Sequence, residues 1–200
     1  MTARAAGAAA FAAWLAGAVA WWATPLEAQI PKLTAEGRIG IAIPAGELAG
    51  PPQSEGGAGA GSSFGFGFAY AVRGGLYLQA GFSQHRLLCA EGCRDLGDLT
   101  SSGYDLALRY LFDAGAVMPW LRLGAISHGV EASSGATEGG KAVSDWTWGI
   151  EAGAGLSVRL TDNLRVTPGF RYVRLDPTFD GEVEIPFRSW IVDVGLLWGF

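Results

Sequence analysis

The last eleven residues, 190–200, alternate strictly between two kinds of side chain, and this limits what the chain can fold into. Every second position is apolar: Trp190, Val192, Val194, Leu196, Trp198 and Phe200. A period of two is that of a β-strand, so the pattern predicts one strand with a continuous apolar face. At an open sheet edge such a strand would promote aggregation, whereas a sheet closed into a barrel has no edge. The C-terminus therefore predicts a closed β-barrel.

Residues 1–28 have the features of a secretory signal peptide. Arg4 precedes an Ala-rich apolar run over residues 8–22, and the small residue Ala28 ends the segment. The run is near the lower length limit for a membrane-spanning helix and is rich in weakly apolar Ala, which favours export over a permanent anchor. We expect residues 29–200 to form one domain, since their number is ordinary for a single fold.

The composition is unusual for a soluble domain. Hydrophobic residues make up 50% of the chain, charged residues only 16%, and the mean hydropathy is +0.24. Beyond the signal peptide, however, no apolar run approaches the ~20 residues of a membrane-spanning helix. Apolar content arranged by alternation is what a transmembrane barrel requires.

Seven further segments alternate in the same way, so the sequence predicts eight strands. The expected ranges of the other seven are 36–43, 63–72, 76–85, 104–112, 117–128, 145–160 and 164–172. An even number of strands brings both ends of the domain to the same side of a membrane. The connections alternate between short and long, and the four long ones span residues 46–61, 87–100, 129–144 and 176–187. Short periplasmic turns and longer external loops are typical of outer-membrane barrels.

Large aromatic residues lie at both ends of these strands. The turn-side set is Tyr70, Tyr110, Phe112, Trp198 and Phe200, and the loop-side set is Phe64, Phe82, Tyr104, Trp148, Tyr172 and Trp190. Two aromatic girdles mark the two interfaces of a membrane. A soluble lipocalin-like barrel is the main architectural alternative. Its exterior would have to be polar, whereas one face of each strand here is apolar.

Three stretches resemble the small eight-stranded outer-membrane barrels of the OmpA/OmpX type. They are residues 148–174 (WGIEAGAGLSVRLTDNLRVTPGFRYVR), residues 119–125 (PWLRLGA) and the terminal Phe200. The resemblance covers residues 29–200 and implies an all-β fold, an eight-stranded antiparallel up-and-down transmembrane β-barrel without a periplasmic peptidoglycan-binding domain. It also implies the outer membrane of a Gram-negative envelope, with Phe200 as the signal for the barrel-assembly machinery. Both mature termini are then expected in the periplasm.

Charged residues on the inward face predict what fills the lumen. The interior of an eight-stranded barrel is just wide enough to be filled by side chains. The mid-strand inward positions hold five Arg and four carboxylates: Glu36, Arg38, Asp105, Arg109, Arg122, Glu151, Arg165, Arg171 and Asp193. An unpaired charge is costly behind a low-dielectric wall, so we expect these groups to pair.

The turn at residues 113–116 suggests which of these charges are neighbours. If Phe112 lies opposite Val117, Arg122 is diagonal to both Asp105 and Arg109. The sequence therefore predicts contacts between Arg122 and these two residues.

The lumen charges have two functional interpretations. In the first they form a plug that satisfies its own hydrogen bonds, which the small strand number favours. In the second, the many inward Gly and Ala residues leave water-filled gaps, and the charges line a narrow, porin-like path for ions or small solutes. We expect a structural, envelope-integrity or surface-interaction role, with the narrow channel as the alternative.

The external loops are strongly acidic. They hold eleven carboxylates and two basic residues: Glu47, Glu55, Glu91, Asp95, Asp98, Glu131, Glu138, Asp176, Asp180, Glu182 and Glu184, with Arg94 and Lys141. This charge does not suit a nucleic-acid partner. Such loops are usually solvated, although they can bridge through divalent cations to anionic headgroups or meet a basic partner. The expected partners are outer-membrane lipids and lipopolysaccharide, and we expect a monomer.

Two further patterns concern metals. The carboxylates of residues 176–184 match no calcium-loop spacing. Cys89 and Cys93 lie in an external loop, where an oxidising compartment favours a disulfide between them. Adding His85 gives three metal ligands without a fourth. We therefore expect a disulfide, no metal site and no cofactor.

Ser83 and His85 share a strand face, which makes an outer-membrane lipid hydrolase the second alternative. A nucleophile needs a hydrogen-bonded base, an orienting acid and an oxyanion site, and no combination of residues fixes all three. Ser127 and His128 point to opposite faces of their strand. We expect polar lining rather than an enzyme, with no catalytic residue.

Overall fold

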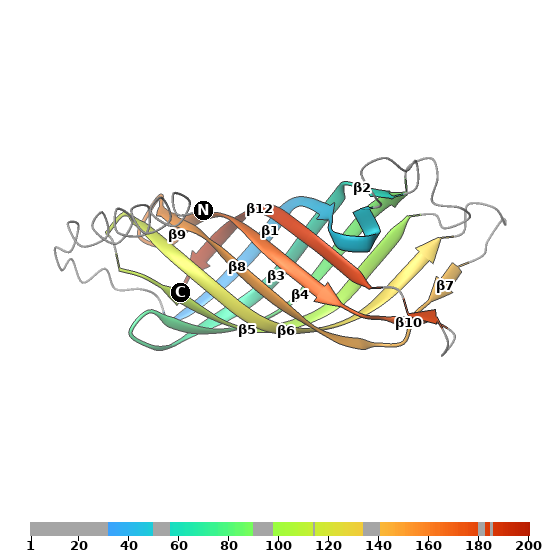
Figure 1. The fold of residues 1–200 in the computed structure, drawn as a ribbon. Coiled ribbons are helices and arrows are strands. Elements are labelled where there is room, and N and C mark those ends of the chain that lie inside the picture. Colours follow the sequence, from blue (N-terminus) through green and yellow to red (C-terminus); the bar gives the residue numbers. More distant parts are fainter. Residues whose placement is uncertain are drawn as a thin grey trace, which may run out of the picture.

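Eight long strands form one closed, all-antiparallel barrel in the computed structural model of the chain (Figure 1). The structure describes residues 32–49, 57–89, 98–113, 115–133, 141–179, 183–184 and 186–200. The expected signal peptide, residues 1–28, lies outside the described residues and stays a prediction. Among the described residues, no helix is long and apolar enough to span a membrane.

The barrel strands follow one another around the ring in chain order. They are β1 (Leu33–Pro44), β3 (Gly61–Arg73), β4 (Leu76–Cys89), β5 (Leu99–Leu111), β6 (Val117–Ser133), β8 (Thr147–Arg159), β9 (Leu164–Leu175) and β12 (Phe187–Gly199). Pairing of β1 with β12 closes the ring, as Ile39 opposite Val194 illustrates. The predicted eight-stranded up-and-down barrel is confirmed.

Short elements extend the barrel at its loop end. They are the 3-10 helix η1 (Gly46–Ala49) and the strands β2 (Ala58–Gly59), β7 (Lys141–Val143), β10 (Thr178–Phe179) and β11 (Val183–Glu184). In Figure 1, β2, β7 and β10 lie at the end opposite the C-terminus. The loop side and the turn side are therefore distinct ends of one elongated barrel.

Several strands run further than the sequence predicted. β6 was expected to end at His128 but continues to Ser133, and β5 begins at Leu99 rather than Tyr104. In the added part of β6, Val130 and Ala132 point inward and are each 2% exposed. The inward–outward alternation of β6 thus continues beyond the apolar outer belt. Its outward residues there are not apolar, so the apolar periodicity that predicts a strand ends before the strand does.

The predicted register between β5 and β6 is wrong by two residues. The backbone nitrogen of Phe112 donates to the carbonyl of Pro119 at 2.9 Å, so these two residues face each other. Gly115, at φ 77°, adopts a left-handed conformation in the intervening turn, which is wider than expected. Turn geometry fixes hairpin register, and Arg122 consequently lies directly opposite Arg109 instead of diagonal to it.

The outer surface of the barrel is an apolar belt. Exposed large hydrophobic side chains occur on all eight barrel strands, and Ile39 of β1 exposes 72% of its surface. Aromatic residues border this belt, including Trp148 on the loop side and Phe200 at the turn-side end. A soluble barrel would present polar groups here, so this arrangement has the character of a transmembrane barrel rather than a lipocalin.

Buried side chains lie in four layers along the lumen, and β4 crosses these layers in order from the turn end. The turn-side cluster is apolar and contains Ala69, Tyr77, Leu111, Met118 and Trp120. The ionic layer and the Ser–His layer, described below, come next. The loop-side cluster is again apolar and contains Ala42, Leu87, Leu99, Ile126, Val130, Ala132, Val173, Leu175, Phe179, Phe187 and Ile191.

Candidate functional site in the barrel lumen

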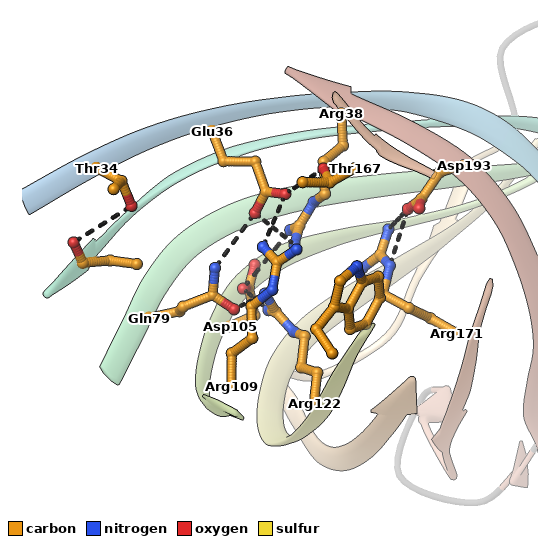
Figure 2. A network of polar contacts seen from close by, with 12 residues as sticks. Thr34, Glu36, Arg38, Gln79, Asp105, Arg109, Arg122, Thr167, Arg171 and Asp193 are labelled. Atoms are coloured by element: carbon orange, nitrogen blue, oxygen red, sulfur yellow. Dashed lines mark hydrogen bonds and ion pairs between the residues drawn. The ribbon is translucent and has the colours of Figure 1, made fainter. Parts of the chain in front are cut away.

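The ionic layer contains four Arg and four carboxylates that point inward from six different strands. Figure 2 shows most of them converging on the barrel interior. The members are Glu36, Arg38, Asp105, Arg109, Arg122, Glu151, Arg171 and Asp193, and none is more than 8% exposed. Equal numbers of positive and negative groups allow burial without a net charge.

Arg122 is the most connected member of this layer. Its Nε donates to Oε1 of Glu151 at 2.5 Å, and its Nη1 donates to Oε1 of Gln79 at 2.8 Å. Its Nη2 pairs with Asp105. One side chain on β6 therefore bonds to β8, β4 and β5. Arg109 lies directly across from it, but the Arg109 guanidinium binds a different carboxylate, that of Glu36.

Arg171 holds the other half of the layer together. Its Nε and Nη2 donate to Oδ2 of Asp193 at 2.9 and 2.6 Å, and its Nη1 donates to Oε2 of Glu151 at 3.1 Å. Glu151 thus joins Arg171 to Arg122. Arg38 joins Glu36 to Asp105, because its guanidinium nitrogens lie 3.8 Å from a carboxylate oxygen of each.

Glu36 has neutral as well as charged partners. Oε1 accepts from Arg109 Nη1 at 3.0 Å and from Thr167 Oγ1 at 2.8 Å, while Oε2 accepts from Gln79 Nε2 at 3.2 Å. Sequence reasoning did not assign Gln79 or Thr167 to the network. Both occupy inward positions by alternation. An uncharged polar residue at an inward position is the sequence signal that could have predicted their membership of the network. A carboxylate can accept about four hydrogen bonds, and these neutral donors fill sites that the arginines leave open.

Arg165 is the predicted member that lies apart from the ionic layer. It is 4% exposed, sits among the turn-side residues, and its Nη1 is 3.8 Å from Sδ of Met118. Among the described residues, no carboxylate is within ion-pair distance of it. The predicted inward set holds five Arg and four carboxylates, and the fold places the additional Arg, Arg165, at the turn side.

The Ser–His layer lies between the ionic layer and the loop-side cluster. Ser63 Oγ is 3.0 Å from His85 Nδ1, and Ser101 Oγ is 2.8 Å from His128 Nδ1. Ser83 Oγ is 3.4 Å from His128 Nε2. The two imidazole rings stack with centroids 5.8 Å apart. All five side chains are at most 4% exposed.

This arrangement does not favour a lipid hydrolase. Ser83 and His85 share a face, as expected, but His85 pairs with Ser63 on β3 and Ser83 with His128 on β6, instead of with each other. Nucleophilic catalysis needs a base held by an acid and a route for the substrate. The described hydrogen bonds of His85 and His128 are to serines, and layers of buried side chains lie on both sides of them.

Two sites considered in the sequence fall partly outside the described residues. The expected disulfide and the alternative metal site with His85, which was not expected, both involve Cys93, which lies in residues 90–97. The disulfide therefore stays a prediction. Within the described ranges, no three His, Cys, Asp or Glu side chains form a group suited to a metal ion. Two of the acidic loop residues are described in ion pairs with arginines: Asp98 pairs with Arg86, and Asp176 with Arg174.

The C-terminal residue lies at the closing seam of the barrel. The backbone nitrogen of Phe200 donates to the carbonyl of Leu33 at 3.0 Å. Its side chain is 70% exposed on the outer surface. The terminal aromatic ring is therefore accessible from outside the folded barrel.

Comparison with known proteins identifies the fold. No family model and no curated protein sequence matches the chain. Neisserial surface protein A matches with a TM-score of 0.65 at 16% identity, over 84% of this chain and 97% of that chain. Outer membrane protein OprG from Pseudomonas aeruginosa matches with a TM-score of 0.58 at 14% identity, over 85% of this chain and 97% of that chain. Outer Membrane Protein W of E. coli matches with a TM-score of 0.54 at 14% identity, over 85% of this chain and 98% of that chain.

These matches span nearly the whole of each solved barrel. Because the sequence identities are low, the matches establish the fold and nothing more. Strand number, antiparallel order and apolar exterior agree with that result. The chain has the fold of the small eight-stranded outer-membrane β-barrels.

Proposed function

We propose that this protein is an integral outer-membrane barrel with a closed lumen and a structural, envelope-integrity or surface-interaction role. The observation that carries the proposal is the pairing of an apolar exterior with an interior lined by four layers of buried side chains. A lipid-facing exterior needs hydrocarbon around it. Cell fractionation tests this directly: the protein should be recovered with outer membranes, and recovery in the periplasmic extract would overturn the proposal.

The closed lumen is supported by the order of its layers. An ion that crosses the barrel would have to pass two apolar clusters and a layer in which four Arg and four carboxylates already neutralise one another. Moving these side chains aside would expose unpaired charges in a low-dielectric interior. The plug therefore fits the contacts better than the narrow channel that the sequence left as the alternative.

Conductance in planar bilayers separates the plug from the channel. Purified barrel inserted into a bilayer should give no reproducible single-channel steps above those of detergent alone. Insertion itself is checked by heat-modifiable migration in detergent gels, which reports a folded barrel. Reproducible steps from folded protein would support the channel for ions or small solutes and would refute a closed lumen.

The proposed partners on the lipid side are outer-membrane lipids and lipopolysaccharide. Arg174 and Arg188 face each other on the outer surface of β9 and β12. The next outward pair towards the turn side is Tyr172 and Trp190, with ring centroids 4.9 Å apart. Aromatic girdles lie at the membrane interface, so arginines beside an aromatic pair of the girdle can extend to the phosphate groups of a lipid leaflet. This cross-strand pair of cations supports contact with anionic headgroups.

Lipid retention by matched variants tests this contact. The double variant Arg174→Gln/Arg188→Gln should co-purify with less lipopolysaccharide than the wild type. Arg73→Gln serves as the control, because Arg73 is an exposed cation at the turn end of β3. Equal retention by the wild type and the double variant would remove this pair from the proposal.

The remaining proposals concern export and assembly. Residues 1–28 direct export, both mature termini lie in the periplasm, and the assembly machinery reads Phe200. Phe200→Ala should slow the appearance of heat-modifiable barrel in cells while leaving refolding in detergent unchanged. Thiol titration without reductant should find no free sulfhydryl at Cys89 and Cys93, and two free thiols would refute the disulfide.

A further inference from the structure

A polar pocket lies on the outer face of the barrel, at the loop-side ends of β4, β5 and β6. Its volume is about 240 Å³, and it is lined by Gln84, Arg86, Asp98, Thr100, Glu131 and Ser133. These positions alternate with buried inward ones such as His85, Ser101 and Ala132, so the pocket lies outside the lumen. Sites for drug-sized ligands enclose about 300–1,000 Å³, so this pocket suits a ligand of about one ring.

Contacts between strands hold the walls of this pocket in place. The Nε of Arg86, on β4, donates to Oδ2 of Asp98 at 3.0 Å. The backbone nitrogen of Ser133, on β6, donates to the carbonyl of Asp98 at 3.1 Å, and its Oγ donates to the same carbonyl at 3.2 Å. Asp98 therefore ties both outer strands to the start of β5. A ligand that enters a pre-formed pocket loses less free energy to the ordering of side chains.

The polar groups of the pocket fit the hydroxyls of a sugar better than a phosphate. One arginine and two carboxylates, those of Asp98 and Glu131, give the lining a formal charge of −1, which opposes an anion. The amide of Gln84 and the hydroxyl of Thr100 both donate and accept hydrogen bonds. A sugar hydroxyl also donates and accepts, so a sugar ring can bond to this mixture of groups along its rim.

Two exposed aromatic rings lie on the membrane side of the pocket. Tyr104 and Trp146 stack with centroids 6.0 Å apart and an interplanar angle of 14°. Tyr104 lies opposite Phe82, and the next outward residue of β4 towards the loops is Gln84 of the pocket. Aromatic rings offer flat apolar faces, and those of a girdle lie at the membrane interface. The order away from the membrane is therefore apolar belt, aromatic rings and polar pocket.

We propose that this pocket binds a sugar unit of an outer-leaflet glycolipid. The acyl chains of that lipid lie along the apolar outer face of β5, where Leu106 and Leu108 expose half of their surface or more. The sugars next to the acyl chains then pass the aromatic rings and reach the pocket. A lipid anchor raises the local concentration of the sugar at this height, which compensates for a small pocket.

This inference rests on the proposed contact with lipopolysaccharide and adds a separate site for its sugars. In the ring order, β5 is four strands from β12 in either direction. The pocket is therefore on the opposite side of the barrel from Arg174 and Arg188, which are proposed to meet the phosphates. One experiment can measure the two sites independently.

The probes are lipopolysaccharide with a complete core and lipid A, which lacks the core sugars. Barrel refolded in phosphatidylcholine vesicles with graded mole fractions of either glycolipid is unfolded with urea. A ligand that binds only the folded state stabilises it in proportion to the logarithm of its concentration. Wild-type protein should need at least about fivefold less lipopolysaccharide than lipid A for the same stabilisation, because the pocket adds hydrogen bonds to the core sugars. Equal requirements for the two glycolipids would overturn the site.

Variants locate the preference. Gln84→Ala/Thr100→Val removes two neutral polar groups without a change of charge and should abolish the fivefold preference. Ser62→Ala, an exposed serine at the loop-side end of β3 and outside the pocket, should keep it. Arg174→Gln/Arg188→Gln should raise the requirement for both glycolipids and leave their ratio unchanged. An undiminished preference in Gln84→Ala/Thr100→Val would refute the site and leave the arginine contact standing, whereas no stabilisation of the wild type by either glycolipid would refute both.

A measurement on the wild type covers the case in which the double variant does not fold. Lipopolysaccharide with a complete core should shift the backbone amide NMR signals of Thr100, Glu131 and Ser133, and lipid A should not. Shifts confined to β9 and β12 would overturn the pocket. Free core oligosaccharide that shifts the same three signals at the same concentration as the intact glycolipid would overturn the membrane as the source of the ligand.

Discussion

Arg122 on β6 donates to Glu151 on β8 at 2.5 Å, at a point where neither side chain exposes more than 4% of its surface. Glu151 also accepts from Arg171, so it is shared by two arginines. Buried ion pairs add little net stability compared with apolar residues, but removing one partner leaves an uncompensated charge in low dielectric. Removing either partner of a pair in this layer should therefore be costly.

Glu151→Gln should destabilise the barrel strongly. The substitution removes the charge shared by Arg122 and Arg171, and breaking a buried pair in this way costs about 3–5 kcal/mol. Urea unfolding of the protein in lipid vesicles measures the loss. Asp162→Asn, in the exposed turn between β8 and β9, is the matched control and should change stability by less than about 0.5 kcal/mol. A similar small change for both variants would mean that the ionic layer is solvated.

The Arg171–Asp193 pair should show strong energetic coupling. Arg171 binds Oδ2 of Asp193 through two nitrogens, at 2.9 and 2.6 Å. The double variant Arg171→Met/Asp193→Leu should lose less stability than the sum of the losses of the two single variants, with a coupling energy of about 1–3 kcal/mol. A double-mutant cycle from unfolding free energies gives this value directly. Additive effects would show that the two side chains do not depend on each other.

Gly155→Ala should destabilise the turn-side half of the lumen. A Cβ at this position would lie 2.6 Å from Cζ2 of the buried Trp120 ring, so the ring or the backbone would have to move. Overpacking of this kind costs about 1–3 kcal/mol. Gly37→Ala, in β1, is the control, because a Cβ there meets nothing within 4 Å. Equal unfolding free energies for the two variants would contradict the tight packing of the Trp120 ring and the Pro168 backbone oxygen around Gly155.

Ile39→Arg should be costly only if lipid surrounds the barrel. Ile39 is 72% exposed and lies opposite Val194 in the middle of the apolar belt. A charged residue on the lipid face near the bilayer centre costs about 2–4 kcal/mol, whereas an exposed position in water tolerates it within about 0.5 kcal/mol. Gln84→Arg, on the outer face near the loop end of β4, should have little effect. Unfolding in vesicles measures both, and a tolerated Ile39→Arg would argue against a transmembrane belt.

The ionic layer illustrates how far the sequence could reach. Alternation placed Glu151, Asp105 and Arg122 on the inward face, and the structure brings them into contact. The register from which the contact between Arg122 and Asp105 was predicted is wrong, because the wide turn after β5 shifts the pairing of β5 with β6 by two residues. Arg122 still reaches Asp105 because a long, flexible side chain spans several positions. The side of the sheet to which a side chain points follows from its own strand, whereas the residues that it contacts depend on the geometry of the turns.

The Ser–His layer shows what could not be predicted. Ser101 and His128 lie on different strands, 27 residues apart, and nothing in either local sequence marks them as partners. Gln79 likewise contacts Glu36 across 43 residues. Contacts across a lumen depend on strand tilt and register together, which no single segment encodes.

The sequence by itself determined the number of strands, which face of each meets lipid, and therefore the closed barrel, because side-chain direction along a strand follows from covalent geometry with a period of two. The tertiary structure alone decided which arginine pairs with which carboxylate, and that Arg165 has no carboxylate partner among the described residues. Those outcomes depend on where eight strands stop relative to one another and how far long side chains reach across the interior, and both are properties of the assembled barrel.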